Sequence, residues 1–136
     1  MEILPGSSLL RLKAGGSLYA LPLESASEIS PLPALTPVPG APASILGLAE
    51  IRGRVVSVLD LGALRAAAAE PSSCREIVSL GSPWSHVALA VERAHGPGES
   101  VSGDPELLHP DRIVATAAGQ VRARYRRAPV RAAERP

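Results

Sequence analysis

The chain has almost no aromatic residues: its 136 residues include two Tyr, one Trp and no Phe. Its core must therefore be built from Leu, Val, Ile and Ala, which contribute less per buried side chain than aromatic rings do. A single cysteine, Cys74, excludes an internal disulfide framework. We expect Cys74 to be a half-buried apolar side chain rather than a reactive thiol.

Long apolar runs are also missing, and no stretch approaches the roughly 18 residues that a membrane-spanning helix requires. The segment MEILPGSSLL at residues 1–10 has no basic residue before its apolar part, which is unlike a secretory signal peptide. We therefore expect a cytoplasmic protein. Glycine and proline are frequent, at 12 and 14 residues, which favours many short elements joined by turns.

The residue types that perform catalysis are few and scattered. The three histidines, His86, His95 and His109, have no second metal ligand at helical spacing, and we expect them to be solvated. The serines lie in no nucleophile-elbow motif, and the Gly-rich stretch AGGS has no following lysine for a phosphate-binding loop. The sequence therefore predicts no enzyme, no metal site and no cofactor.

Alternation of apolar and polar residues predicts mostly β structure. Three hairpins are expected, with strands at 8–13 and 18–23, at 75–81 and 86–92, and at 112–117 and 121–126. Other expected elements are an extended segment at 24–30, a proline-rich loop at 31–42 and a short helix at 61–70. The predicted fold class is all-β, built as small antiparallel barrels.

Charge is distributed unevenly along the chain, although the net charge is only +1. Residues 1–119 carry eight basic and twelve acidic side chains, a balance of −4, whereas residues 120–136 carry six arginines and one glutamate, a balance of +5. The strand expected at 121–126 has one arginine face, which protects a sheet edge against aggregation. The alternatives are nucleic-acid binding, or attraction to an acidic partner or an anionic membrane surface.

The most strongly patterned segment is ILGLAEIRGRVVSVLDLGAL, residues 45–64, in which Arg52-Gly53 separates two apolar runs. The Arg-Gly pair is typical of a turn, and the β-branched run after it predicts a strand buried on both faces. The expected core residues of that strand are Val55, Val56, Val58 and Leu59. Because the segment holds no histidine, cysteine or carboxylate pair, its expected role is positioning or partner binding.

Three stretches, LYALPLESASEIS, TPVPGAPASILGLAEIRGRVVSVLDL and REIVSLG…HVALAVERA, follow in an order that resembles the CheW family of chemotaxis coupling proteins. The resemblance covers residues 8–101, and its most specific part is the spacing from Pro39 through Gly47 and Arg52-Gly53 to Asp60-Leu61. It implies a non-enzymatic scaffold of two small SH3-like antiparallel β-barrels with at most one or two short helices. The implied domain spans 8–126, between an N-terminal extension at 1–7 and a basic, disordered tail at 127–136.

The resemblance also implies partners and contact residues. Members of the family link the cytoplasmic tips of methyl-accepting chemoreceptors to the regulatory domain of a CheA-type histidine kinase in receptor arrays, alongside other CheW-like proteins. The kinase-facing motif is matched by Glu28 and Ile29. The receptor- or partner-binding motifs are matched by Ile45, Gly47, Leu48, Ile51, Arg52, Gly53, Val87, Leu89 and Val91.

The sequence departs from the family pattern at several points. Glu50 stands where the family has Asn, Ser57 replaces a Pro, and residues 91–94 include a Glu and an Arg. The stretch VRARYRRAPVRAAERP stands where a second apolar strand and a terminal helix are usual, so we expect a shortened second barrel without that helix. These departures favour an auxiliary coupler, of the FrzB kind, that binds the kinase poorly. The alternatives are a complete coupler that activates the kinase and a small nucleic-acid-binding β-barrel that uses the C-terminal arginines.

Overall fold

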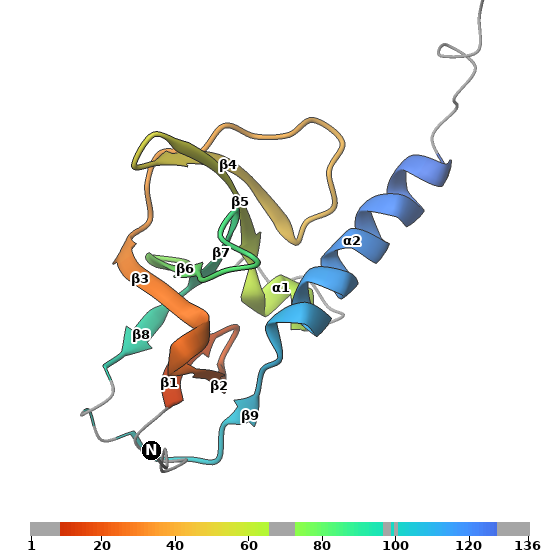
Figure 1. The fold of residues 1–136 in the computed structure, drawn as a ribbon. Helices are drawn as coiled ribbons and strands as arrows, with labels where there is room; N and C mark the ends of the chain where they lie inside the picture. Colours follow the sequence, from red (N-terminus) through yellow and green to blue (C-terminus); the bar gives the residue numbers. More distant parts are fainter. Residues whose placement is uncertain (1–8, 66–72, 97–98, 100, 128–136) are drawn as a thin grey trace, which may run out of the picture.

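The computed structural model describes residues 9–65, 73–96, 99 and 101–127, and in this part of the chain the strands form two sheets (Figure 1). The four-stranded sheet has the order β8-β1-β2-β9, with β1 at Leu9–Ala14, β2 at Ser17–Pro22, β8 at Arg93–His95 and β9 at Glu106–Leu107. The five-stranded sheet has the order β3-β6-β7-β5-β4, with β3 at Ala26–Pro31, β4 at Ile45–Ile51, β5 at Arg54–Asp60, β6 at Glu76–Leu80 and β7 at Val87–Val91. The expected extension at 1–7 and all but the first residue of the expected tail lie outside the described residues.

Most of the predicted strands are confirmed. The first hairpin, β1 with β2, turns at Gly15-Gly16, and the second, β6 with β7, spans the predicted segment 75–92. β3 lies where an extended segment was expected, after the short 3-10 turn η1 at Leu23–Ser25. The predicted helix is present as α1, Leu61–Arg65, and the remainder of its predicted range lies outside the described residues.

The five-stranded sheet lies between two apolar layers. On one face Val78 and Leu89 pack in a first cluster with residues of the four-stranded sheet, α1 and the C-terminal helix. On the other face Val58 and Ile77 belong to a second cluster, which is covered by residues of the loop 32–35. β7 is the central strand, so all five of its residues are buried. This position explains why its sequence is apolar throughout.

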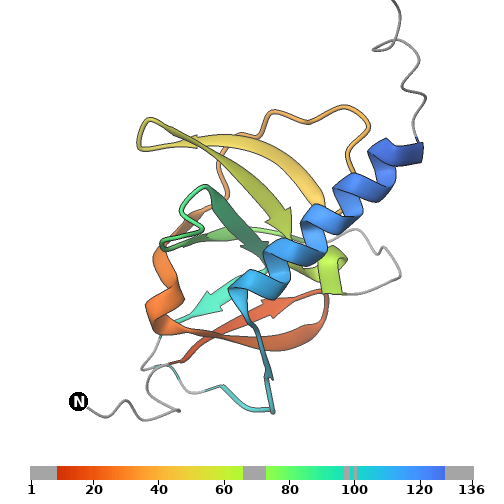
Figure 2. The same ribbon diagram turned by 45° about the vertical axis from the view of Figure 1, so that its right-hand side comes forward.

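The hairpin predicted at 112–126 is wrong, because this segment belongs to the 18-residue helix α2, Pro110–Arg127. Figure 2 shows α2 running diagonally across the molecule past α1. Its residues Ile113 and Ala117 lie one turn apart and are buried in the first cluster. Alanine and arginine favour helices, and Pro110 stands at the first helical position, where proline is well tolerated. The expectation that the chain lacks a C-terminal helix is therefore also wrong.

The second half of α2 holds the proline-rich loop in place. Arg124 donates a hydrogen bond from Nε to the carbonyl oxygen of Gly40 at 2.8 Å and another from Nη2 to Ala41 at 3.3 Å. The hydroxyl of Tyr125 donates to the carbonyl oxygen of Pro39 at 3.4 Å. Arg124 was expected on the charged face of an edge strand, and instead it joins a helix to a loop.

β5 is buried on both faces over only part of its length. Val56, Val58 and Leu59 are buried, as predicted. Val55 is 61% exposed, so its assignment to the core is wrong. β5 pairs with β7 only from Ser57 onward, so the start of β5 extends past its neighbour and has no covering layer on the face of Val55.

Candidate functional site

The turn between β4 and β5 places Arg52 in a backbone conformation that few side chains adopt. Ile51 pairs with Arg54, which leaves Arg52 and Gly53 as a two-residue loop. Their φ angles are 54° and 76°, as a type I′ hairpin turn requires. Among the described residues Arg52 is the only non-glycine residue with positive φ. The predicted turn is confirmed, and a strained residue of this kind points to a role for its side chain.

Arg52 makes a two-pronged ion pair with Glu28. Nε donates to Oε1 and Nη2 donates to Oε2, each at 3.0 Å. Glu28 lies on β3 and Arg52 follows β4, so the pair joins the two edge strands of the five-stranded sheet. The hydrogen bond from Arg52 lowers the pKa of Glu28, and the same hydrogen bond raises the pKa of Arg52. The resemblance assigned these two residues to different partners, whereas the structure brings them together on one surface.

A cavity of about 200 Å³ lies beside this ion pair, with Arg54, Val56 and Ser79 among its walls. Ser79 is 9% exposed, and its Oγ has no hydrogen-bond partner among the described residues. A buried hydroxyl without a partner is unfavourable, so such a group calls for an explanation. Sequence reasoning missed Ser79. The sequence does contain a signal for Ser79: it lies two residues after the apolar Ile77, so both side chains lie on the same, inward-facing side of β6.

The other residues matched to contact motifs divide into exposed and buried ones. Ile29 is 40% exposed on β3, whereas Ile45, Leu48 and Ile51 are half-buried along β4. The three residues predicted to border the receptor groove are buried: Val87, Leu89 and Val91. They lie on the central strand and belong to the first cluster, so a direct contact of these side chains with a receptor is incompatible with the structure.

Gly47 allows a close approach of two backbone segments. Its φ is 149°, and a Cβ at this position would lie 2.6 Å from the carbonyl oxygen of Thr36. Thr36 and Leu48 exchange two backbone hydrogen bonds of 2.8 Å each, which attach the proline-rich loop to β4. Glycine is required here for the fold, and this requirement alone accounts for its place in the motif.

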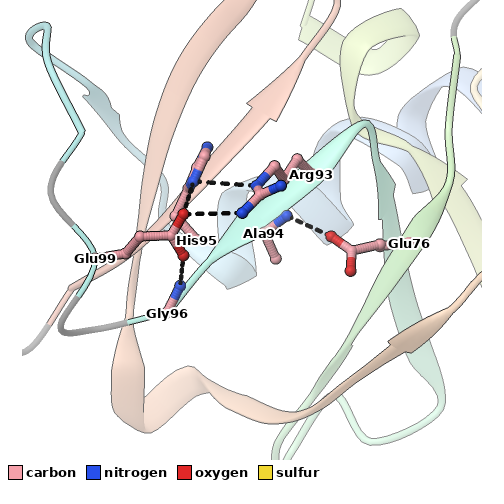
Figure 3. Close-up of polar contacts among 6 residues, drawn as sticks. All are labelled: Glu76, Arg93, Ala94, His95, Gly96 and Glu99. Atoms are coloured by element: carbon pink, nitrogen blue, oxygen red, sulfur yellow. Dashed lines mark hydrogen bonds and ion pairs between the residues drawn. The ribbon is translucent and has the colours of Figure 1, made fainter.

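A second polar cluster lies at β8, an edge strand of the four-stranded sheet (Figure 3). The carboxylate of Glu99 contacts Nη2 of Arg93 and Nδ1 of His95, each at 2.9 Å. These contacts, with that of His95 the largest, lower the pKa of Glu99 to about 2. The prediction that His95 is solvated is therefore wrong, whereas His86 and His109 are exposed.

The surface around Arg52 offers contacts rather than reactive groups, namely oriented N–H donors and a carboxylate. Among the described residues no group of three His, Cys, Asp or Glu side chains is arranged to hold a metal ion. No helix within those residues is long and apolar enough to cross a bilayer. Cys74 is half-buried against the second cluster, as predicted.

Comparison with known proteins gives a family and a fold. The family model of the CheW-like domain matches residues 8–122. Among solved structures, the crystal structure of the scaffolding protein TtCheW from Thermoanaerobacter tengcongensis is similar, with a TM-score of 0.54 at 21% sequence identity. The similarity covers 65% of this chain and 61% of the TtCheW chain, so it spans less than two thirds of the length of TtCheW. No curated protein matches the sequence significantly. The mostly β, CheW-like fold implied by the resemblance is thereby confirmed, but the sheets are mixed rather than purely antiparallel, because β2 pairs with β9 and β5 with β7 in parallel, and α2 is a long helix.

Proposed function

Because this chain belongs to the CheW-like domain family, we propose that it is a non-enzymatic chemosensory adaptor. Its proposed partners are the cytoplasmic tips of methyl-accepting chemoreceptors, the regulatory domain of a CheA-type histidine kinase, and other CheW-like proteins. In this role the protein works in the cytoplasm at receptor arrays, where it supplies binding surfaces rather than chemistry.

The observation that carries the proposal is the ion pair of Arg52 and Glu28. The Arg52 side chain is 78% exposed, yet two hydrogen bonds fix the orientation of its guanidinium. A guanidinium has five N–H donors, and only two of them point at Glu28. The others are free to meet a carboxylate or backbone carbonyl of a partner. Because the side chain is already ordered, it loses little conformational freedom on binding.

Two exposed apolar side chains lie near the ion pair in sequence, on the opposite faces of their strands. Ile29 follows Glu28 on β3, and Val55 follows the turn that contains Arg52. A receptor tip is expected to be an amphipathic helical hairpin, which docks through apolar contacts with a few polar anchors. The oriented Arg52 would supply such a polar anchor, and Ile29 and Val55 would offer apolar contacts on the opposite faces of their strands.

Two versions of the adaptor function differ in how well the kinase is bound. The auxiliary version is supported by Glu50, an exposed carboxylate two residues before Arg52 where the family has Asn. The expected loss of the C-terminal helix also favoured the auxiliary version, but α2 is present, so this argument no longer applies. The complete coupler is the second candidate, because α2 packs on the core and holds the loop at Pro39–Ala41.

A nucleic-acid-binding role has lost its main support. It depended on a row of arginines along a C-terminal strand, and residues 121–126 are helical instead. Two N–H groups of Arg124 are bonded to loop carbonyls rather than turned outward to meet phosphates.

The proposal is tested by calorimetry of this protein with a chemoreceptor tip fragment and, separately, with the regulatory domain of a CheA-type kinase. We expect binding to at least one of them. Arg52→Gly should weaken that binding about ten- to hundredfold, as loss of a charge-assisted hydrogen bond does. Glycine is the suitable replacement because it adopts a φ of 54° without strain. The matched control is Arg75→Ala, which removes another exposed arginine and should bind normally.

The outcomes separate the parts of the proposal. If the folded wild-type protein binds neither partner, the adaptor function is wrong. If a partner binds equally well to wild type and Arg52→Gly, the contact surface lies elsewhere. Phosphotransfer assays with receptor and kinase distinguish the two versions, because only the complete coupler should activate the kinase as strongly as a standard coupling protein does.

A further inference from the structure

The cavity of about 200 Å³ beside the Arg52–Glu28 ion pair contains a polar group that the proposed function leaves unexplained. Ser79 is one of its walls and is 9% exposed, and its Oγ has no hydrogen-bond partner among the described residues. A serine hydroxyl can donate one hydrogen bond and accept others, so an unpaired hydroxyl in the interior is costly. A ligand that enters the cavity and pairs with Ser79 would account for the hydroxyl.

The register of the strands puts the Ser79 side chain on the cavity side of the sheet. Ser79 pairs directly with Glu28 across β3 and β6, so their two side chains lie on one face. Ile77 lies two residues before Ser79 and therefore on the same face, where it belongs to the second cluster. Val56 belongs to that cluster as well and is another wall of the cavity. The hydroxyl of Ser79 thus lies on the side that faces the cavity.

The cavity walls carry a net positive charge. Their charged residues are Glu28, Arg52 and Arg54, two guanidinium groups against one carboxylate, which gives a balance of +1. Two hydrogen bonds from Arg52 neutralise Glu28. Arg54 lies two residues before Val56 on β5 and so on the same face, and it makes no hydrogen bond or ion pair with another described residue. Its positive charge therefore has no counterpart in the cavity wall.

These groups suit a carboxylate. Its two oxygens only accept hydrogen bonds, and the walls offer the guanidinium of Arg54, the remaining donors of Arg52 and the hydroxyl of Ser79. A cation would be repelled by the unpaired guanidinium, and an apolar group would leave the hydroxyl without a partner. A phosphate monoester carries about two negative charges near neutral pH, more than the balance of the walls.

The size of the cavity indicates a group rather than a whole small molecule. Pockets for drug-sized ligands are about 300–1,000 Å³, and this cavity is smaller than that range. A single side chain that ends in a carboxylate has a suitable size. The exposed guanidinium of Arg52 lies at the same cavity, so one partner can contact both.

We propose that the cavity formed by Arg52, Arg54 and Ser79 binds one carboxylate group. Its source is an acidic side chain of a bound partner, and for this source we rely on the proposed adaptor function. The preference of the walls for a carboxylate does not depend on that function. A small free carboxylate therefore tests the cavity separately from any partner.

The first experiment titrates the 15N-labelled full chain with sodium acetate at pH 7, while NaCl keeps the ionic strength constant. We expect the backbone amide signals of Arg52, Arg54 and Ser79 to shift and saturate, with half-saturation at about 1–10 mM, as the few contacts of a four-atom ligand allow. Acetamide has nearly the same shape without the charge and should leave these signals unchanged. Arg54→Gln and Ser79→Ala should each weaken acetate binding about tenfold.

Ser79→Ala has a second readout that separates ligand binding from a structural role. Because the hydroxyl has no partner among the described residues, its removal should leave the urea midpoint of the free protein unchanged or raise it. The matched controls are Ser57→Ala and Arg75→Gln, which remove a serine and an exposed arginine outside the cavity. Both should bind acetate as the wild type does.

The second experiment identifies the source of the carboxylate. Calorimetry measures the chemoreceptor tip or the kinase regulatory domain, whichever binds, against wild type, Arg54→Gln and Ser79→Ala. We expect each variant to weaken binding about tenfold, and saturating acetate to weaken binding to the wild type in competition. NaCl at the same ionic strength is the control for general screening.

The outcomes distinguish the cavity, its ligand and the adaptor function. Acetate shifts that do not saturate, or that both variants leave unchanged, would overturn the carboxylate site, and so would a lowered urea midpoint of Ser79→Ala, since the hydroxyl would then already have a partner. Saturable acetate binding with unaltered partner binding by both variants would overturn the partner as the source. If the protein binds neither partner, the adaptor function and that source are wrong, whereas the acetate titration still decides the site.

Discussion

Replacing Gly47 with alanine should destabilise the protein strongly, although it adds only one methyl group. The new Cβ would lie 2.6 Å from the carbonyl oxygen of Thr36 and 3.1 Å from its carbonyl carbon. The φ of 149° adds a second cost, because a non-glycine residue in that region is strained by about 1–3 kcal/mol. Relief of the contact requires the proline-rich loop to move away from β4.

That movement breaks the two backbone hydrogen bonds between Thr36 and Leu48, which are worth about 1 kcal/mol each. Backbone strain and lost hydrogen bonds together predict a decrease of about 3–5 kcal/mol in the free energy of unfolding. Leu32 and Leu35 of the same loop cover the second cluster, so the displaced loop also uncovers apolar surface. A loss of this size is a large part of the stability of a small domain.

Urea denaturation followed by circular dichroism measures this change. Gly16→Ala is the control, because Gly16 has a φ of 78° but no heavy atom within 4 Å of where its Cβ would lie. It should cost only the backbone strain, about 1–2 kcal/mol. A Gly47→Ala protein that loses no more stability than Gly16→Ala would refute the close approach of the loop to β4.

Three further predictions concern other parts of the structure. Because the pKa of Glu99 is lowered to about 2 from its ordinary 4.5, its contacts should stabilise the fold fully above pH 4.5 and progressively less as pH falls towards 2. Glu99→Gln should flatten the pH dependence of the urea midpoint in that range, and an unchanged dependence would contradict the cluster. Ile113→Ala should lower the free energy of unfolding by about 2–5 kcal/mol, since its side chain is buried on α2, and a loss below about 1 kcal/mol would contradict the packing of α2. Because Val55 is exposed and Leu89 is buried, Val55→Ser should change the free energy of unfolding by less than about 0.5 kcal/mol, whereas Leu89→Ala should lower it by about 2–5 kcal/mol. Equal decreases for the two variants would contradict the exposure of Val55.

The hairpins could be predicted because their signals are local. Gly15-Gly16 and Arg52-Gly53 supply the positive φ angles of their turns, and alternating apolar residues identify the strands on either side. Val55 was misassigned because alternation gives the side of a strand on which a residue lies but not the length of the neighbouring strands. β7 pairs with β5 only from Ser57, and nothing in the local sequence encodes that limit.

α2 was misread because its end also fits a strand pattern. Val121, Ala123 and Tyr125 alternate with arginines, and a period of two outweighed the weaker helical signals. Those signals were present in Pro110, a favoured first helical residue, and in the spacing of the buried residues that follow it. Ile113 and Ala117 of the helix pack in the first cluster against residues distant in sequence, and no local window of sequence contains that packing.

The arrangement of the candidate site could not be predicted from the sequence. Arg52 and Glu28 were both selected by motif, yet they are 24 positions apart on opposite edges of a sheet. Their meeting depends on the curvature of all five strands. The cavity beside them depends on the same curvature, which is why Ser79 went unnoticed.

The arrangement of the four-stranded sheet sets an order for folding during synthesis. β1 and β2 leave the ribosome first, but their neighbours β8 and β9 come from residues 93–107, after the last strand of the five-stranded sheet has ended at Val91. The five-stranded sheet is complete within residues 26–91, so we expect it to fold first. Until then the nascent N-terminal hairpin has two unpaired edges, and Leu10 and Leu12 lack their covering layer. Pairing of β8 and β9 with this hairpin joins residues far apart in the chain and is therefore slow. The newly made protein thus exposes an apolar hairpin that chaperones can recognise before folding is finished.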